Sequence, residues 1–145
     1  MTEDIVYLAS PYSSTDKAIE HIRFIEVCKA AGDLMNRGFA LYGPICHTHP
    51  IAQVCDLPKG WEFWRGLDMA FLKVCKALVV LKLDGWDKSV GVTAELEEAR
   101  RMGLPIGWMS EDGTLTWDTI PEFVMHKLIA EGMKLPLMGP NLPYR

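Results

Sequence analysis

The sequence has no long hydrophobic run and no cluster of basic residues. Its longest apolar run, residues 77–81, is far shorter than the roughly 20 residues of a membrane-spanning helix. Residues 1–4 are polar, so we expect no signal peptide. The formal net charge is -4, and the chain lacks the clustered Lys and Arg that nucleic-acid phosphates require. We therefore expect a cytoplasmic protein that binds neither membranes nor nucleic-acid polymers.

Paired cysteine spacing is also missing. The chain has four cysteines, Cys28, Cys46, Cys55 and Cys75, without the regular spacing of a disulfide framework. Two of them lie in apolar helical or strand-flanking segments, which suit a reduced thiol. The sequence contains no internal repeat and no low-complexity stretch.

What the chain does have is enough apolar material for one core. It is 145 residues long and 49% hydrophobic, which suits one domain and is too short for two ordinary ones. We expect an α/β domain over residues 1–131. We expect the tail, residues 132–145, to wrap over the surface or to reach a neighbouring subunit.

Predicted strands alternate with predicted helices along the chain. Short apolar runs that end in Gly, Pro or Ser turns indicate strands, and longer segments with a 3.6-residue period indicate helices. The order predicts a doubly wound parallel sheet, Rossmann-like or flavodoxin-like, flanked by helices on both faces. The predicted strands are 5–9, 39–42, 77–83 and 105–109, the predicted helices are 15–37, 61–75, 91–103 and 117–131, and residues 43–60 are predicted as a long loop.

Ligands of such sheets bind beyond the carboxyl ends of the strands. The segments that follow the predicted strands are 10–14, 43–60, 84–91 and 110–113. We expect the functional site among these four segments.

Two carboxylates interrupt apolar helix stripes next to this edge of the sheet. Glu95 falls on the same helical arc as Val92 and Leu96, and Asp68 falls near the centre of the stripe of the preceding helix. A buried carboxylate without a partner costs on the order of several kcal/mol, so its position needs a reason. A functional site is one reason. The alternative is that each carboxylate caps a backbone group or pairs with Arg23 or Arg65.

Two carboxylates with a nearby phenol suit the cleavage of a glycosidic bond. One carboxylate attacks the anomeric carbon or stabilises the oxocarbenium-like transition state, and the other handles protons. Glu95 lies near the start of its predicted helix, where the helix dipole favours the charged form. Asp68 lies among Trp64, Leu67 and Phe71, which we expect to raise its pKa.

Three motifs resemble the nucleoside 2-deoxyribosyltransferase superfamily. They are Val-Tyr-Leu-Ala-Ser at 6–10, Asp68 with the helix that leads into the strand at 77–80, and Ser-Val-Gly-Val-Thr-Ala-Glu-Leu at 89–96. The nearest branch is the nucleoside 5'-monophosphate N-glycosidases, which share the spacing of the serine, Gly-Val and Glu-Leu around the nucleophile. The resemblance covers residues 5–108.

The resemblance implies roles for individual residues. Glu95 matches the nucleophile, Asp68 matches the acid/base or a ligand of a sugar hydroxyl, and Tyr7 matches the phenol that orients the nucleophile. Ser89, with Gly91 in the same motif, matches the serine that contacts the 5'-phosphate in the monophosphate branch. The transferases that act on free nucleosides tend to have an acidic residue at this position, so Ser89 favours a nucleotide.

Further residues complete the expected phosphate site. Ser10, Ser13 and the backbone amides that lead into the first long helix form a phosphate cradle in this interpretation. The segment 10–13 stands where the monophosphate branch has Gly-Ser-x-Arg, so Lys17, Arg23 or Lys88 takes the place of that arginine.

Two loops contain candidate groups for the nucleobase. We expect Trp86 to act as a lid or to stack on the base, whereas helical spacing favours a core position for Trp64. One histidine of the loop at 46–50, His47 in our prediction, lines the base or sugar pocket; the alternative is a solvated loop residue. A zinc site formed by His47 and His49 with Cys46 and Cys55 is the less favoured interpretation of this segment.

We therefore predict an N-glycosidase that cleaves the base–sugar bond of a nucleoside 5'-monophosphate through Glu95, with no metal and no organic cofactor. One alternative is a deoxyribosyltransferase, in which a second base accepts the sugar in place of water. Another is a module that binds a nucleotide or nucleoside without turnover. The resemblance, with apolar tail residues, predicts a homodimer or higher homo-oligomer; those residues are Met133, Leu135, Leu137 and Met138.

Overall fold

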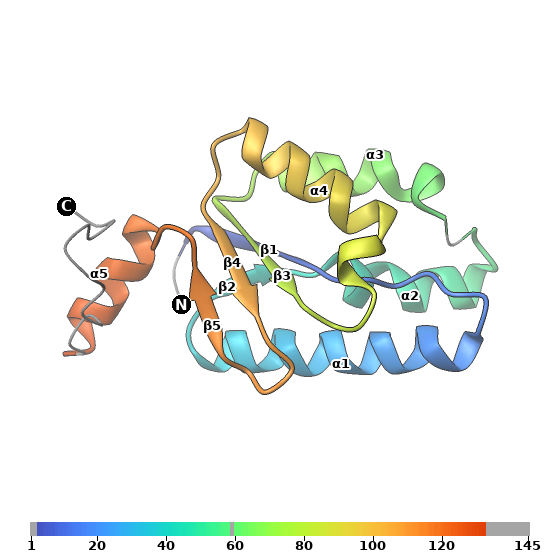
Figure 1. The fold of residues 1–145 in the computed structure, drawn as a ribbon, viewed down its shortest axis with the longest axis horizontal. Helices are drawn as coiled ribbons and strands as arrows, with labels where there is room; N and C mark the ends of the chain where they lie inside the picture. Colours follow the sequence, from blue (N-terminus) through green and yellow to red (C-terminus); the bar gives the residue numbers. More distant parts are fainter. Residues whose placement is uncertain (1–2, 59, 133–145) are drawn as a thin grey trace.

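The computed structural model describes residues 3–58 and 60–132. Five strands form one sheet in the order β2-β1-β3-β4-β5, with helices on both faces (Figure 1). The tail residues expected to reach a neighbouring subunit lie outside the described residues. The elements in chain order are β1 (Ile5–Ala9), α1 (Lys17–Asn36), β2 (Ala40–Tyr42), α2 (Pro44–Cys55), α3 (Trp61–Leu72), β3 (Ala77–Leu81), η1 (Trp86–Lys88), α4 (Val90–Arg101), β4 (Ile106–Met109), β5 (Leu115–Trp117) and α5 (Glu122–Ala130).

The first four strands are parallel, which confirms the predicted α/β fold class. β1 is central: it pairs with β2 on one side and with β3 on the other. The strand order therefore reverses between β1 and β3: β2 lies on the outer side of β1, and β4 lies on the outer side of β3. In sheets of this kind, the carboxyl ends of the two strands at such a reversal diverge and leave room for a ligand.

The sheet is not wholly parallel, and here the prediction was wrong. Residues 115–117 form the antiparallel edge strand β5, and the last helix begins at Glu122 rather than at Trp117. A turn at Gly113, whose φ is +90°, connects β4 to β5. The register pairs Gly107 with Trp117, and a Cβ at position 107 would lie 2.9 Å from the Trp117 ring. Glycine therefore lets this indole lie directly on β4.

The segment predicted as a long loop contains a helix, α2, which is a second correction. Gly43 precedes it and Pro44 occupies the first turn, where the missing N–H is tolerated. Pro50 lies inside α2, although proline is unfavourable in the interior of a helix. The hydroxyl of Thr48 donates to the carbonyl of Pro44 at 2.8 Å, and Asp56 ends the helix at a φ of +50°.

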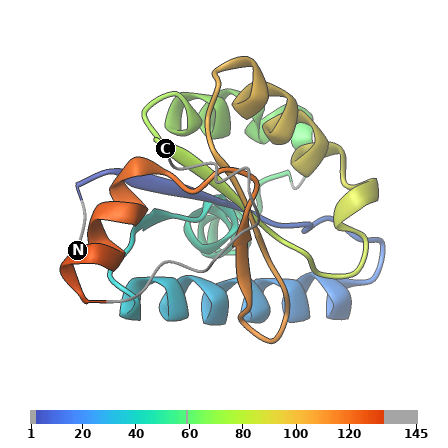
Figure 2. The same cartoon turned by 60° about the vertical axis from the view of Figure 1, so that its left-hand side comes forward.

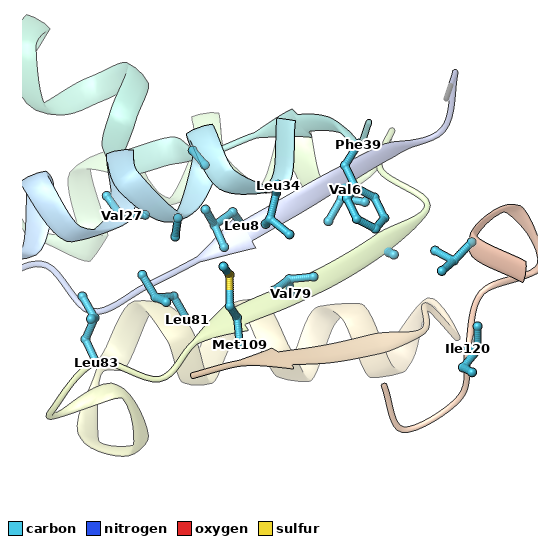
Figure 3. Close-up of a cluster of buried hydrophobic side chains, with 14 residues drawn as sticks. Val6, Leu8, Val27, Leu34, Phe39, Val79, Leu81, Leu83, Met109 and Ile120 are labelled. Atoms are coloured by element: carbon cyan, nitrogen blue, oxygen red, sulfur yellow. The ribbon is translucent and has the colours of Figure 1, made fainter. Parts of the chain in front are cut away.

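Successive side chains of β1 point to opposite faces and enter two separate cores. Val6 and Leu8 pack toward α1, where Figure 3 shows them beside Leu34 and Val79. Tyr7 and Ala9 belong instead to the core beneath α3 and α4. Figure 2 shows these two helices together on one face of the sheet and α1 on the other.

All four cysteines are free thiols, and the Sγ atoms of Cys28 and Cys46 lie 3.7 Å apart between α1 and α2. Among the described residues, every helix is too short or too polar to span a lipid bilayer.

Candidate active site

A cavity of about 670 Å³ opens at the carboxyl ends of β1 and β3, where the strand order reverses. Its volume is in the range of small-molecule sites. One wall consists of the segment after β1 and α2, and the other consists of the starts of α3 and α4. Six of the predicted site residues line it: Ser10, Ser13, Asp68, Ser89, Gly91 and Glu95.

Glu95 and Tyr7 form a hydrogen bond beneath this cavity. The Tyr7 hydroxyl, from the middle of β1, donates to Oε2 of Glu95 on α4. Tyr7 is fully buried and Glu95 is 4% exposed. Burial, followed by the negative charge of Glu95, raises the pKa of Tyr7 far above its ordinary value. The phenol therefore stays protonated and fixes the orientation of the carboxylate.

Asp68 is the second carboxylate at this position. It lies on α3, is 7% exposed, and its Oδ1 is a buried atom without a hydrogen-bond partner in the described part of the chain. Burial raises the pKa of Asp68 to about 7. The expectation of a raised pKa for this carboxyl, based on its apolar helix neighbours, agrees with the structure.

The ionisation of Glu95 differs from the expectation. Burial raises its pKa to about 8, the Tyr7 hydrogen bond lowers it, and the nearby Asp68 charge raises it. We expected the helix dipole to dominate and keep Glu95 charged. α4 begins at Val90, so Glu95 lies in the second turn, beyond the first turn where the dipole acts. Desolvation outweighs the dipole, and burial favours the protonated form of both carboxyl groups.

Ser10 and Ser89 both line the cavity, but their hydroxyl groups differ in hydrogen bonding. Ser10 Oγ is buried and has no hydrogen-bond partner among the described residues, so it is available to a ligand. Ser89 caps α4: its Oγ accepts from the backbone N–H of Val92 at 3.2 Å. Ser89 stands at the start of α4, where backbone N–H groups favour an anion.

Arg23 joins the two loops that border the cavity. Its guanidinium donates to the carbonyls of Tyr12 at 3.2 Å, Ser13 at 2.9 Å and Asp84 at 3.1 Å. Gly85, with a φ of +90°, permits this contact, because a Cβ there would lie 2.9 Å from Arg23 Nη2. Arg23 thus holds the loops after β1 and β3 in place. Lys88 also lines the cavity, whereas Lys17 lines a neighbouring hollow.

Trp86 and His47 do not line this cavity. The Trp86 ring packs edge-on against Trp108, with centroids 5.4 Å apart. His47 is exposed on α2, near the rings of Tyr42 and Phe71. Aromatic side chains that do line the cavity include Trp61 and Trp64, at the start of α3, and Tyr12.

The sequence analysis did not assign several lining residues to the site, among them Thr48 and His49. The Tyr12 hydroxyl and His49 Nδ1 are hydrogen-bonded, and the His49 ring stacks on Phe24 with centroids 4.1 Å apart. Their positions follow from α2, which was predicted as a loop. The available signal was Pro44 after Gly43, a pattern typical of a helix start.

No metal centre is visible among residues 3–58 and 60–132. His, Cys, Asp and Glu side chains there form no group of three or more that could hold a metal ion. The zinc interpretation of the segment at 46–55 thus has no ligand set in the described chain.

Comparisons with known proteins identify a similar solved structure and a matching protein family. The fold is similar to that of a 2-deoxyribosyltransferase from the psychrotolerant bacterium Bacillus psychrosaccharolyticus, described as a biocatalyst for the synthesis of antiviral and antitumoral nucleosides. The TM-score is 0.51 and the identity 21%, over 85% of this chain and 81% of that chain. At this identity, the similarity shows a shared fold. No curated protein matches the sequence. A protein-family model described as a domain of unknown function (DUF1937) matches residues 4–111, so the chain belongs to this family.

Proposed function

We propose that the protein cleaves the N-glycosidic bond of a nucleoside 5'-monophosphate, with Glu95 as the nucleophile. The observation that carries the proposal is the buried Tyr7–Glu95 hydrogen bond at the cavity, with the unpartnered Asp68 oxygen beside it. Because an unsatisfied buried carboxylate is costly, its presence favours a functional role over a structural one.

The proposed reaction follows the double-displacement route of retaining glycosidases. The charged form of Glu95 bonds to the anomeric carbon, the base leaves, and water then hydrolyses the glycosyl ester. Tyr7 donates to Oε2, which leaves the second oxygen of Glu95 to attack. Asp68 assists the leaving base or binds a sugar hydroxyl.

The same cavity contains candidate groups for the anionic end of the substrate. Ser10, Ser89 and the positively charged Lys88 all line the cavity, and Ser89 stands at the start of α4. Hydroxyls, helix N-terminal amides and a cation together suit a phosphate. These groups support a monophosphate over a free nucleoside.

Base exchange is the second candidate, and the shared fold with a 2-deoxyribosyltransferase favours it. Both reactions use the same glycosyl-Glu95 intermediate and differ only in the acceptor. Formation of a new nucleoside or nucleotide when a second free base is added would identify the transferase.

The test is base release, measured by chromatography, from a panel of ribo- and deoxyribonucleoside 5'-monophosphates and the corresponding nucleosides. We expect the wild type to release base from a monophosphate and Glu95→Ala to release none. Glu97→Gln is the matched control, because this exposed carboxylate lies on the same helix and does not line the cavity. Base release by folded Glu95→Ala at the wild-type rate would refute the assignment. Ligand binding without release by the wild type, even with an acceptor base, would indicate a binding module.

A further inference from the structure

Tyr12 and His49 form a second polar group in the cavity wall. Tyr12 lies in the segment after β1, and His49 lies on α2. Glu95 and Asp68 come from α4 and α3 instead, on the other face of the sheet (Figure 1). The cavity therefore has a carboxylate wall and a phenol–imidazole wall.

Packing fixes the phenol–imidazole pair. His49 is 4% exposed, and its ring lies between the Tyr12 hydroxyl, bonded to Nδ1, and the stacked ring of Phe24. Burial, followed by the charge of the buried Glu20, raises the pKa of Tyr12 to about 12. Tyr12 is thus held in one position as a protonated phenol.

The proposed bond cleavage needs a proton donor on the side of the base. When the C1'–N bond breaks, its electron pair moves to the base, and a neutral base leaves readily only if it is protonated. Retaining enzymes place the proton donor and the nucleophile on either side of the scissile bond. Asp68 shares a wall with Glu95 and interacts with its charge, so Asp68 suits the sugar better than the base.

We propose that Tyr12 donates the proton to the leaving base and that His49 resupplies it; this inference rests on the proposed function. Glu95 bonds to C1' as the C1'–N bond breaks. The Tyr12 hydroxyl proton moves to the base, and a proton moves from Nδ1 of the imidazolium form of His49 to the Tyr12 oxygen. Water then hydrolyses the glycosyl ester, restores the Glu95 carboxylate and releases one proton, which recharges His49.

The test compares two leaving groups on the same sugar 5-phosphate. One is the base that the wild type releases, which needs protonation. The other is 4-nitrophenol, which departs as a stable anion and needs no donor. For Tyr12→Phe and His49→Gln, we expect kcat for base release to fall by about a hundredfold or more, and nitrophenolate release to stay within about threefold of wild type.

Controls separate this role from a structural one. His126→Gln changes an exposed histidine on α5 and should leave both rates at the wild-type value. Thermal unfolding identifies folded variants, and His49→Gln gives the same comparison if Tyr12→Phe does not fold. Equal losses on both substrates, or no loss on either, would overturn the proton-donor role. Release of neither leaving group by the wild type would overturn the proposed function itself.

Discussion

The two faces of the sheet carry different kinds of core. On the α1 face, an apolar cluster that includes Leu8, Leu34 and Val79 forms the core, and the buried polar side chains of α1 and α2 (Glu20, Thr48 and His49) lie outside this cluster. On the α3/α4 face, Tyr7 is part of the core, and the carboxylates of Glu95 and Asp68 are buried at its edge. The raised pKa values of both carboxyl groups show that burial disfavours their charged forms. The apolar cluster of the first face thus stabilises the fold, while the buried carboxylates of the second face lower the stability in order to hold reactive groups in place.

The largest effect on stability should come from the apolar face. Leu34 on α1 is 1% exposed and packs in the middle of that cluster. Leu34→Ala leaves a cavity, and we expect it to lower the free energy of unfolding by about 3 kcal/mol, measured by urea denaturation. Activity per folded molecule should be unchanged, because Leu34 does not line the active-site cavity. A loss below about 1 kcal/mol would show that this face is not the main source of stability.

On the carboxylate face, removing a titratable group should raise the free energy of unfolding rather than lower it. The pKa of Glu95 rises from 4.5 to about 8 on folding, so the folded state binds the proton more tightly within this window. Stability from this group is complete at low pH and declines as the pH rises through the window. Gln does not titrate and can still accept from Tyr7. We expect Glu95→Gln to match the wild type near about pH 4 and to exceed it by about 2 kcal/mol above about pH 8.

Urea denaturation at a series of pH values checks this result. Glu97→Gln, on the solvent side of α4, is the control and should show no such pH-dependent gain. If Glu95→Gln is less stable than the wild type at alkaline pH, then the carboxylate stabilises the fold and the contrast between the faces disappears.

The strands and the carboxylate pair could be predicted because their signals are local. The run at residues 77–81 is apolar at every position, and the structure buries all five side chains. Glu95 and Asp68 were found because each breaks a helical stripe that packing otherwise requires to be apolar. Burial, the physical quantity behind both signals, is encoded in residue spacing.

α2 and β5 could not be predicted because their signals depend on tertiary contacts. Pro50 argues locally against a helix, but α2 persists because it packs against α1 and β1. The short strand β5 forms because Gly107 leaves room for the Trp117 ring, a contact that joins distant positions. His49 lines the cavity because it lies on α2, whereas Trp86 does not line it and packs against Trp108 instead.

The smallest expected effect concerns Ser89, which caps α4 and, in the proposed function, also contacts the phosphate. Its hydroxyl caps α4, so Ser89→Ala should lower the free energy of unfolding by about 1 kcal/mol. Ser89→Asp keeps a capping oxygen and should retain stability, since aspartate caps as well as serine. Its negative charge should repel a phosphate at the start of α4. We expect Ser89→Asp to raise KM for a nucleoside 5'-monophosphate more than Ser89→Ala does, without raising KM for the free nucleoside. An equal KM change for both substrates would mean that Ser89 acts only as the helix cap and that the phosphate binds elsewhere.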